Sequence, residues 1–82
     1  MTAYAIYDKK AEIYHEPIFY KREEEITAEI KISFSSKDYQ NIQPIEFDLF
    51  ELGSYDTNTA KFNLYPSPKH VYNIQSIIKK DK

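Results

Sequence analysis

His15 and Glu16 stand next to each other, and both are residue types that bind metal ions in proteins. The helical zinc motif that begins with a His-Glu pair needs a second His one turn further on. That position is occupied by Phe19, and Pro17 lies in between. The chain has no Cys, and its only other His is the distant His70. Two imidazoles make a weak ligand set, so we predict neither a metal ion nor a cofactor.

Carboxylates and hydroxyls do not complete a catalytic pattern either. Carboxylates spaced by two residues on a strand face the same way, as a general acid and base require. The candidates for such a pair are Glu46, Asp48, Glu51 and Asp56. Carboxylates that alternate with apolar residues are, however, typical of a solvated strand face. Ser54 and Tyr55 have no neighbouring His that could act as a base, so nucleophilic catalysis has no support. Phosphate-binding loops and nucleophile elbows need several glycines, and Gly53 is the only glycine of the chain. We therefore expect no enzyme; a hydrolase is the alternative if a pocket joins His15 or His70 to a carboxylate.

Aromatic and basic residues are interleaved near the N-terminus, as in proteins that bind single-stranded nucleic acid. The six candidates for such a surface are Lys9, Lys10, Tyr14, Tyr20, Lys21 and Arg22. In these proteins the bases stack on aromatic rings while cations follow the phosphate backbone. The C-terminal lysines could extend this basic strip: Lys79, Lys80 and Lys82. The simpler alternative is that the tyrosines pack in the core or in an interface between proteins.

Charge is unevenly distributed, although the net charge is only -2 and the sequence pI is about 5.6. Residues 45–56 carry four acidic side chains and no Lys or Arg, a charge of -4. Residues 61–82 carry five Lys and one Asp, a charge of +4. Such a dipolar chain can bind an anion at one end and a basic partner, or its own copy, at the other. The candidate protein-binding residues are Glu46, Asp48, Glu51, Tyr55 and Asp56.

The length of 82 residues allows one domain, residues 1–82, around a single small core. No apolar run reaches about 18 residues, and the N-terminus has no basic n-region followed by an apolar segment, so we expect neither membrane insertion nor secretion. The apolar and aromatic runs predict a strand over residues 3–7 and a hairpin over residues 45–65. Residues 13–20 contain Pro17, which lacks an N–H group, so this stretch should be an edge strand or an ordered loop.

Two features of the hairpin carry further predictions. The alternation from Ile45 to Leu49 indicates a half-buried strand with Phe47 and Leu49 in the core. Leu49 and Phe50 are adjacent and both large, which indicates either a bulge or a strand covered on both faces. Pro66 and Pro68 are expected to end the second strand.

Residues 22–35 give conflicting signals. Three glutamates at positions 23–25 favour the first turn of a helix, where negative charge meets the positive end of the helix dipole. From position 26 to 34, however, every even residue is apolar and every odd one polar, which favours a strand. On a helix the apolar residues would form two opposite stripes: Ile26, Ile30 and Phe34 on one side, Ala28 and Ile32 on the other. Such a helix would have to be covered on two faces.

Two blocks of the chain resemble a known family. Residues 5–14 read AIYDKKAEIY and are followed by Pro17-Ile18-Phe19, and residues 44–56 read PIEFDLFELGSYD. These blocks are similar, in order and spacing, to the D-x-K-A-E-x-Y then P-F-F opening and the P-x-D-Y-x-L-F-x-x-G-x-[FY]-D segment of the small nonstructural protein of gokushoviruses. These are phages of the Microviridae with single-stranded circular DNA genomes. The only glycine, Gly53, falls on the family's glycine, which is consistent with a special backbone demand at the strand end.

The resemblance implies an amphipathic helix between the two blocks, and on that ground we predict a helix over residues 22–34. The fold class is then α+β, a small antiparallel sheet with one helix; if residues 26–35 form a strand, it is all-β. The family's A-x-R-x-F pattern in the helix reads Ile26-Thr27-Ala28-Glu29-Ile30 here, without its Arg. Any role of a basic helix face is therefore not carried over.

The resemblance also implies a nonstructural protein that acts in the host cytoplasm and is absent from the mature virion. We accordingly predict an accessory protein that supports viral DNA replication, or its coupling to packaging, by binding viral or host proteins and also single-stranded DNA. The alternative is a pure protein-interaction module without affinity for nucleic acid. Eight Tyr and five Phe are more large side chains than one small core readily hides, so we expect a homodimer.

Overall fold

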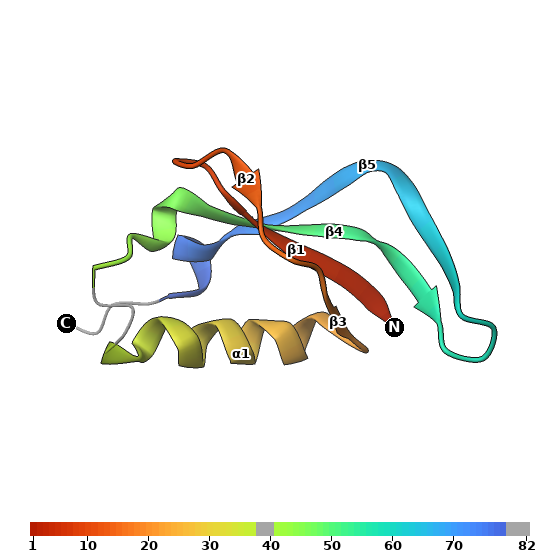
Figure 1. Ribbon diagram of the computed structural model, residues 1–82. Coiled ribbons are helices and arrows are strands. Elements are labelled where there is room, and N and C mark those ends of the chain that lie inside the picture. Colours follow the sequence, from red (N-terminus) through yellow and green to blue (C-terminus); the bar gives the residue numbers. More distant parts are fainter. Residues whose placement is uncertain (38–40, 79–82) are drawn as a thin grey trace.

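In the computed structural model, which describes residues 1–37 and 41–78, one α-helix lies along one face of an antiparallel sheet (Figure 1). The strands are β1 (Thr2–Asp8), β2 (Ile13–Tyr14), β3 (Ile18–Tyr20), β4 (Phe47–Asp56) and β5 (Lys61–Asn73). The helices given for the described residues are α1 (Glu23–Ser35) and the short 3-10 helices η2 (Pro44–Glu46) and η3 (Ile74–Ile77). The sheet order is β2-β1-β4-β5, and β3 pairs with β1 as well. The predicted α+β class is confirmed.

The segment with Pro17 is an edge, as predicted. β2 pairs with the end of β1, where Tyr7 lies opposite Tyr14, and β3 pairs with its beginning, where Ala3 lies opposite Phe19. Residues 15–17 connect the two short strands without being part of either. A residue that cannot donate a hydrogen bond is thereby kept out of the ladder.

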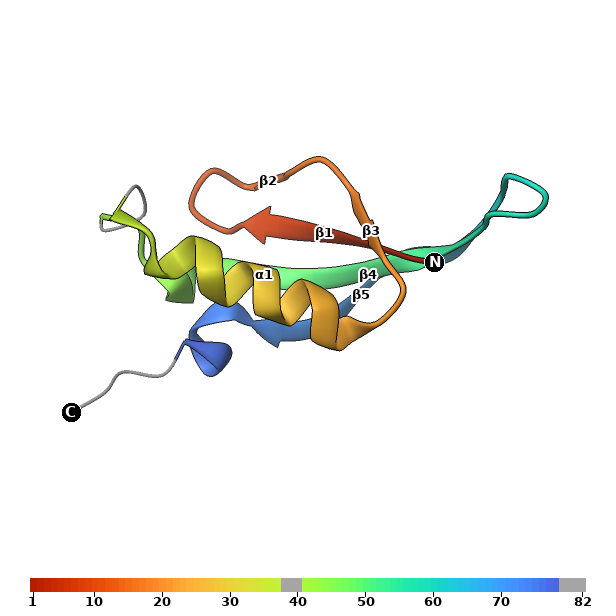
Figure 2. The same ribbon diagram turned by 90° about the horizontal axis from the view of Figure 1, so that it is seen from below.

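The helix over residues 22–34 is confirmed as α1, and the all-β alternative is wrong. Ile26 and Ile30 are buried in one cluster with Tyr4, Leu49 and Ile74, and this cluster is the core of the molecule. In Figure 1 α1 runs beneath the strands, and in Figure 2, seen from below, it lies in front of them, so the sheet covers only one side of it. The second apolar stripe is left uncovered among the described residues, and the Ile32 side chain is 66% exposed.

The second half of the sheet begins later than the alternation suggests. Ile45 and Glu46 belong to η2, and β4 starts at Phe47. Pro44 fixes a backbone angle that suits a helical turn, and the Glu46 N–H donates to the Gln43 carbonyl at 3.0 Å. The prediction that the strand starts at Ile45 is therefore wrong by two residues.

The register confirms an irregularity at Leu49 and Phe50. Leu49 pairs with Tyr72 while Phe50 pairs with His70, so Val71 is an extra residue on β5. Leu49 points toward α1 and is fully buried, while its neighbour Phe50 points to the other face.

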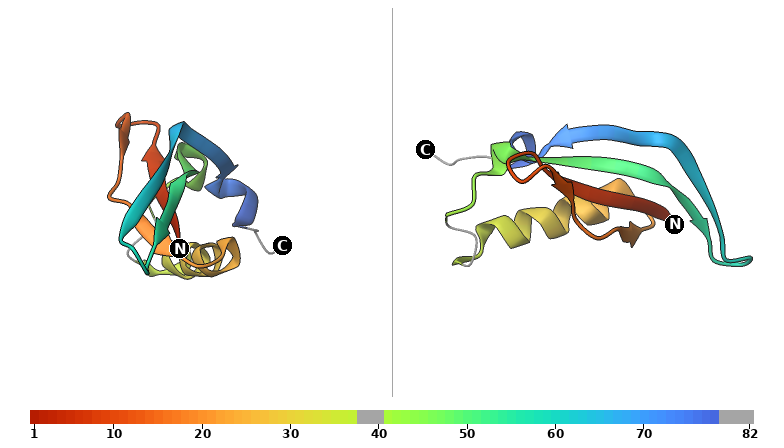
Figure 3. Two further views of the ribbon diagram at one scale, coloured as in Figure 1. Left: turned by 90° about the vertical axis from the view of Figure 1, so that its right-hand side faces the viewer. Right: turned by 45° about the horizontal axis from the view of Figure 1, so that its top comes forward.

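The two prolines do not end the second strand of the hairpin, contrary to the prediction. β5 continues to Asn73, but its pairing with β4 jumps from Leu64 opposite Gly53 to Lys69 opposite Glu51. Residues 65–68, which include both prolines, thus lie opposite a single residue of β4. The ribbon arches away from β4 there (Figures 1 and 3). Missing N–H groups are tolerated because this stretch is outside the ladder.

Candidate functional site

The face of the sheet that points away from α1 carries a cluster of four rings. Tyr7 pairs with Tyr14 and alternates with core-facing residues, so its ring points away from the helix. The ring centroids lie 4.6 Å apart for Tyr7 and Tyr14, 5.5 Å for Tyr14 and Phe50, and 5.3 Å for Phe50 and His70. Tyr14 is 47% exposed. We call these four residues the ring cluster; no helix of the described chain covers it.

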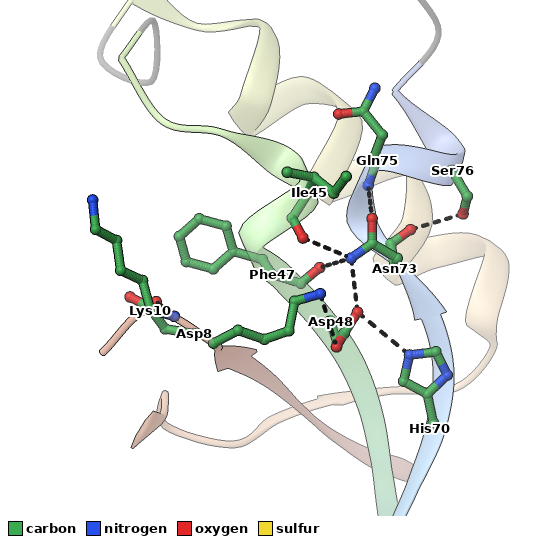
Figure 4. Close-up of polar contacts among 10 residues, drawn as sticks. Asp8, Lys10, Ile45, Phe47, Asp48, His70, Asn73, Gln75 and Ser76 are labelled. Carbon is green, nitrogen blue, oxygen red and sulfur yellow. Dashed lines mark hydrogen bonds and ion pairs between the residues drawn. The ribbon is translucent and has the colours of Figure 1, made fainter. Parts of the chain in front are cut away.

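A partly buried carboxylate lies at one end of the ring cluster. Asp48 pairs with Tyr7, so its side chain is on the same face, and only 13% of it is exposed. The Lys9 Nζ lies 3.8 Å from Asp48 Oδ2, and the His70 Nε2 lies 3.4 Å from Oδ1 (Figure 4). The carboxylate is therefore compensated by one cation and one imidazole, and half-exposed Lys9 remains accessible to solvent.

Asn73 fixes this carboxylate and the neighbouring backbone. Its Nδ2 donates to Asp48 Oδ1 at 2.8 Å and to the carbonyl oxygens of Ile45 and Phe47 at 3.0 and 3.1 Å. Its Oδ1 accepts the Gln75 N–H at 3.1 Å and so caps η3 (Figure 4). Little in the sequence points to Asn73: the only signal is an amide side chain directly before an apolar segment.

A second group of rings lies further along the same face. Tyr55 is 5.8 Å from Phe19 and 4.9 Å from Phe62 between ring centroids. Phe62 is 57% exposed. These residues come from β3 and from the part of the β4–β5 hairpin that extends past α1.

The six nucleic-acid candidates fall into two separate sets. Lys9, Lys10 and Tyr14 come together, because the turn after β1 leads directly into β2. The Asp8 carboxylate accepts the Lys10 N–H at 3.0 Å and thereby holds this turn. Tyr20, Lys21 and Arg22 lie at the other end of β1, about 20 Å away along the strand.

Tyr20 is also turned toward the helix. Its side chain packs against the core cluster and is not a free stacking platform. Lys21 and Arg22 are exposed, and Arg22 stands at the N-cap position of α1. Of the six residues, therefore, only Tyr14 belongs to the ring cluster, and only Lys9 and Lys10 adjoin it.

The acidic candidates do not form one surface. Asp48 and Tyr55 point away from α1, while Glu51 pairs with buried Tyr4 and points to the helix side. Glu51 accepts a hydrogen bond from the Tyr65 hydroxyl at 2.5 Å, which raises the pKa of that tyrosine. Glu46 lies in η2, and the exposed Asp56 carboxylate accepts the Asn58 N–H at 2.8 Å in the hairpin turn.

A half-open cavity of about 490 Å³ lies between α1 and the β1–β3 edge. Most of its lining is apolar: Ile6, Ile18, Tyr20, Ile26, Ile30, Phe34, Ile42 and Phe47. The polar lining residues are Asp8, His15, Glu29 and Ser33, so His15 does share a cavity with two carboxylates. No ion pair joins them, however, and no group of three or more His, Asp or Glu within the described ranges could hold a metal ion. The cavity thus offers an apolar volume with acidic groups.

Comparison with known proteins identifies the class of the chain as a phage protein. The family model described as Phage ORF5 protein matches residues 1–77, and the chain belongs to this family. The comparisons with curated proteins and with solved structures gave no match. Within residues 1–37 and 41–78, no helix is both long enough and apolar enough to cross a lipid bilayer.

Proposed function

We propose that the chain is a nonstructural accessory protein of a phage with a single-stranded DNA genome, and that it binds single-stranded DNA on the ring cluster. Membership in the Phage ORF5 family supports the viral assignment. The two blocks that resemble the gokushovirus nonstructural protein support the finer assignment to the Microviridae. On this proposal the protein is no enzyme. It acts in the host cytoplasm with replication or packaging proteins and is absent from the mature virion.

The observation that carries the DNA-binding part is the position of the ring cluster beside two lysines. Tyr14 is exposed on the uncovered sheet face, and Lys9 and Lys10 follow in the adjoining turn. Each base that stacks on an exposed ring contributes about 1–3 kcal/mol, independently of its identity. The Asp48 carboxylate on this face is paired with Lys9 and contacted by the His70 imidazole, so a phosphate does not meet a bare carboxylate. Binding without base specificity is the expected behaviour.

Fluorescence anisotropy of a labelled oligothymidine of about 16 nucleotides tests the proposal. We expect saturable binding that weakens with salt, with a log–log slope of about -1.4 if two lysines each replace one counterion. Tyr14→Ala should weaken binding by roughly 5- to 150-fold, the equivalent of one lost stacking contact. Ile32→Ala is the matched control, because it also removes an exposed apolar side chain but lies on the outer side of α1.

Lack of saturable binding at tens of micromolar protein in low salt contradicts the proposal. In that case the protein-interaction module is the better account of the chain, and the partner would have to be sought among proteins. Equal weakening by Tyr14→Ala and Ile32→Ala would contradict the assignment to the ring cluster alone.

A further inference from the structure

We propose that single-stranded DNA continues from the ring cluster to a second group of rings, so that one strand is held at two places on the same sheet face. This inference rests on the proposed function, because it starts from DNA bound on the ring cluster. The second ring group consists of Phe19 in β3, Tyr55 in β4 and Phe62 in β5. Its ring centroids lie 4.9, 5.8 and 6.1 Å apart, and Phe19 and Phe62 are 37% and 57% exposed. Bases can therefore reach these rings from solvent.

The register of β1 places both ring groups on one face. Tyr14 pairs with Tyr7, and Phe19 pairs with Ala3. Buried Tyr4 points toward α1, so Ala3 and Tyr7 both point to the opposite side of the sheet. Neighbouring residues of paired strands share a face, and the two ring groups therefore lie at the two ends of β1 on the face without the helix.

The charges of β4 on this face allow a polyanion to bind. Of the three acidic residues in β4, only Asp48 lies on the face of the rings, and Lys9 is paired with it. Glu51 points to the helix side. Asp56 follows Tyr55 directly, so alternation turns it to the helix side as well. Phosphates that pass along the rings of β4 thus meet no unpaired carboxylate from this strand.

Each ring group adjoins two cations. Lys9 and Lys10 lie in the turn beside the ring cluster, and exposed Lys21 and Arg22 follow directly after β3, two and three residues beyond Phe19. The glutamates at positions 23–25 come next in the chain, but they belong to α1 on the other side of the sheet (Figure 1). The two separate sets of nucleic-acid candidates thereby become the two ends of one path. Stacking rings with cations along the backbone path are the combination that binds single strands.

The spacing of the two ring groups gives the length of DNA that fills both. Tyr7 and Ala3 are four residues apart on β1, which corresponds to about 13 Å. A strand with about 3.4 Å between successive phosphates crosses this distance in about four nucleotides. With about two bases stacked at each group, the whole site takes about eight nucleotides, which is within the range for a single-strand-binding domain. Between the groups β1 contributes only Ala5 to this face, a small uncharged residue.

Competition by unlabelled oligothymidines of 4 to 16 nucleotides against a labelled 16-mer tests the second contact. We expect the affinity to rise steeply up to about eight nucleotides, because the second contact is then made within one complex, and slowly beyond. Phe62→Leu keeps an apolar side chain but removes the ring, and should weaken binding of the 16-mer at least about fivefold. It should change binding of the 4-mer by at most about twofold, because four nucleotides fit on the ring cluster alone. Phe62→Trp restores a ring and should bind the 16-mer as the wild type does.

Tyr65→Leu is the matched control, because it removes a ring from the same strand but on the other face. The Tyr65 hydroxyl donates to Glu51 on the helix side, so this variant should leave binding of both oligonucleotides within about twofold. Circular dichroism establishes that the variants are folded.

Two results would overturn the second contact and leave the proposed function standing. One is equal weakening of the 16-mer by Phe62→Leu and Tyr65→Leu. The other is an affinity that stops rising at four nucleotides while Tyr14→Ala still weakens binding. Lack of saturable binding of the 16-mer to the wild-type chain would overturn the proposed function and the second contact together.

Discussion

The backbone of Asn63 in β5 passes so close to Gly53 in β4 that no side chain fits between them. A Cβ atom on Gly53 would lie 2.3 Å from the Asn63 carbonyl oxygen and 2.7 Å from the Leu64 Cα. Gly53 also has a φ of +150°, which residues with a side chain rarely adopt. Gly53→Ala should therefore lower the free energy of unfolding by about 2–5 kcal/mol, measured by urea denaturation. Ser54→Ala, at the exposed neighbouring position, should change it by less than about 0.5 kcal/mol.

Truncation of Leu49 should be costly, because its side chain is fully buried between the sheet and α1. We expect Leu49→Ala to lower the free energy of unfolding by about 2–5 kcal/mol. Phe47→Ala should cost less, since Phe47 is only half-buried at the margin of the core. Thermal or chemical denaturation decides the order; a larger loss at Phe47 than at Leu49 would contradict this description of the core.

The Asn73 side chain joins η2, β4 and η3, so its removal should loosen all three together. Asn73→Ala leaves the carbonyl oxygens of Ile45 and Phe47 without this donor, and we expect a loss of about 1–3 kcal/mol in unfolding free energy. Ser76→Ala removes one exposed hydrogen bond to the Asn73 carbonyl and serves as control, with a loss below about 1 kcal/mol. Amide hydrogen exchange in β4 and η3 should accelerate in the first variant and not in the second.

Besides Tyr65, two tyrosines near the core, Tyr4 and Tyr72, should lose their protons at a higher pH than an ordinary tyrosine. Burial raises the pKa of Tyr4, to which the Glu51 and Glu23 carboxylates add. Burial also raises the pKa of Tyr72, while its hydrogen bond with Thr27, at 2.6 Å, lowers it. A raised pKa means that the folded state holds the proton more tightly than the unfolded state, whose tyrosines titrate near pH 10. This contribution to stability is therefore complete below about pH 10 and is lost as the pH rises through the folded-state pKa values.

NMR titration of the tyrosine Cζ resonances measures these pKa values residue by residue. Thr27→Val removes the hydrogen bond that favours the tyrosinate, so the pKa of Tyr72 should rise further in this variant. Titration of Tyr4 and Tyr72 at the ordinary value in the folded protein would show that neither hydroxyl is buried as described.

The sequence predicted the strands at both ends of the chain and the edge position of Pro17, because these depend on local alternation and on the missing proline N–H. The sequence pattern could not decide whether the central segment, residues 22–35, forms a helix or a strand. Ile26, Ile30 and Phe34 satisfy a helix stripe and a strand face equally well. The glutamates at positions 23–25 favoured the helix and the alternation favoured a strand, so the family resemblance decided between them. The conflict arose from Ile32, which is apolar but exposed. Ile30 differs from Ile32 in being buried by tertiary contacts, and periodicity does not predict that difference.

Local patterns were also insufficient to assemble the site. Tyr14 and Tyr20 look alike in the sequence, yet they come from two strands on opposite sides of one connection, and one ring faces solvent while the other packs toward α1. The position of Gly53 was correctly linked to a backbone demand, although the glycine lies within β4 and not at its end. The role of Asn73 depends on hydrogen-bond acceptors that lie 25 to 28 residues away in the sequence, and no local sequence pattern predicts such contacts.

The arch of β5 at Pro66 and Pro68 has a consequence for the behaviour of the chain at high concentration. β5 is the last strand of the sheet, and an unpaired outer strand of this length invites further chains to add and grow into fibrils. Two missing N–H groups and a change of direction divide this edge into two short stretches. The outer edge of β5 therefore offers a further chain no long continuous row of backbone donors and acceptors on which to add.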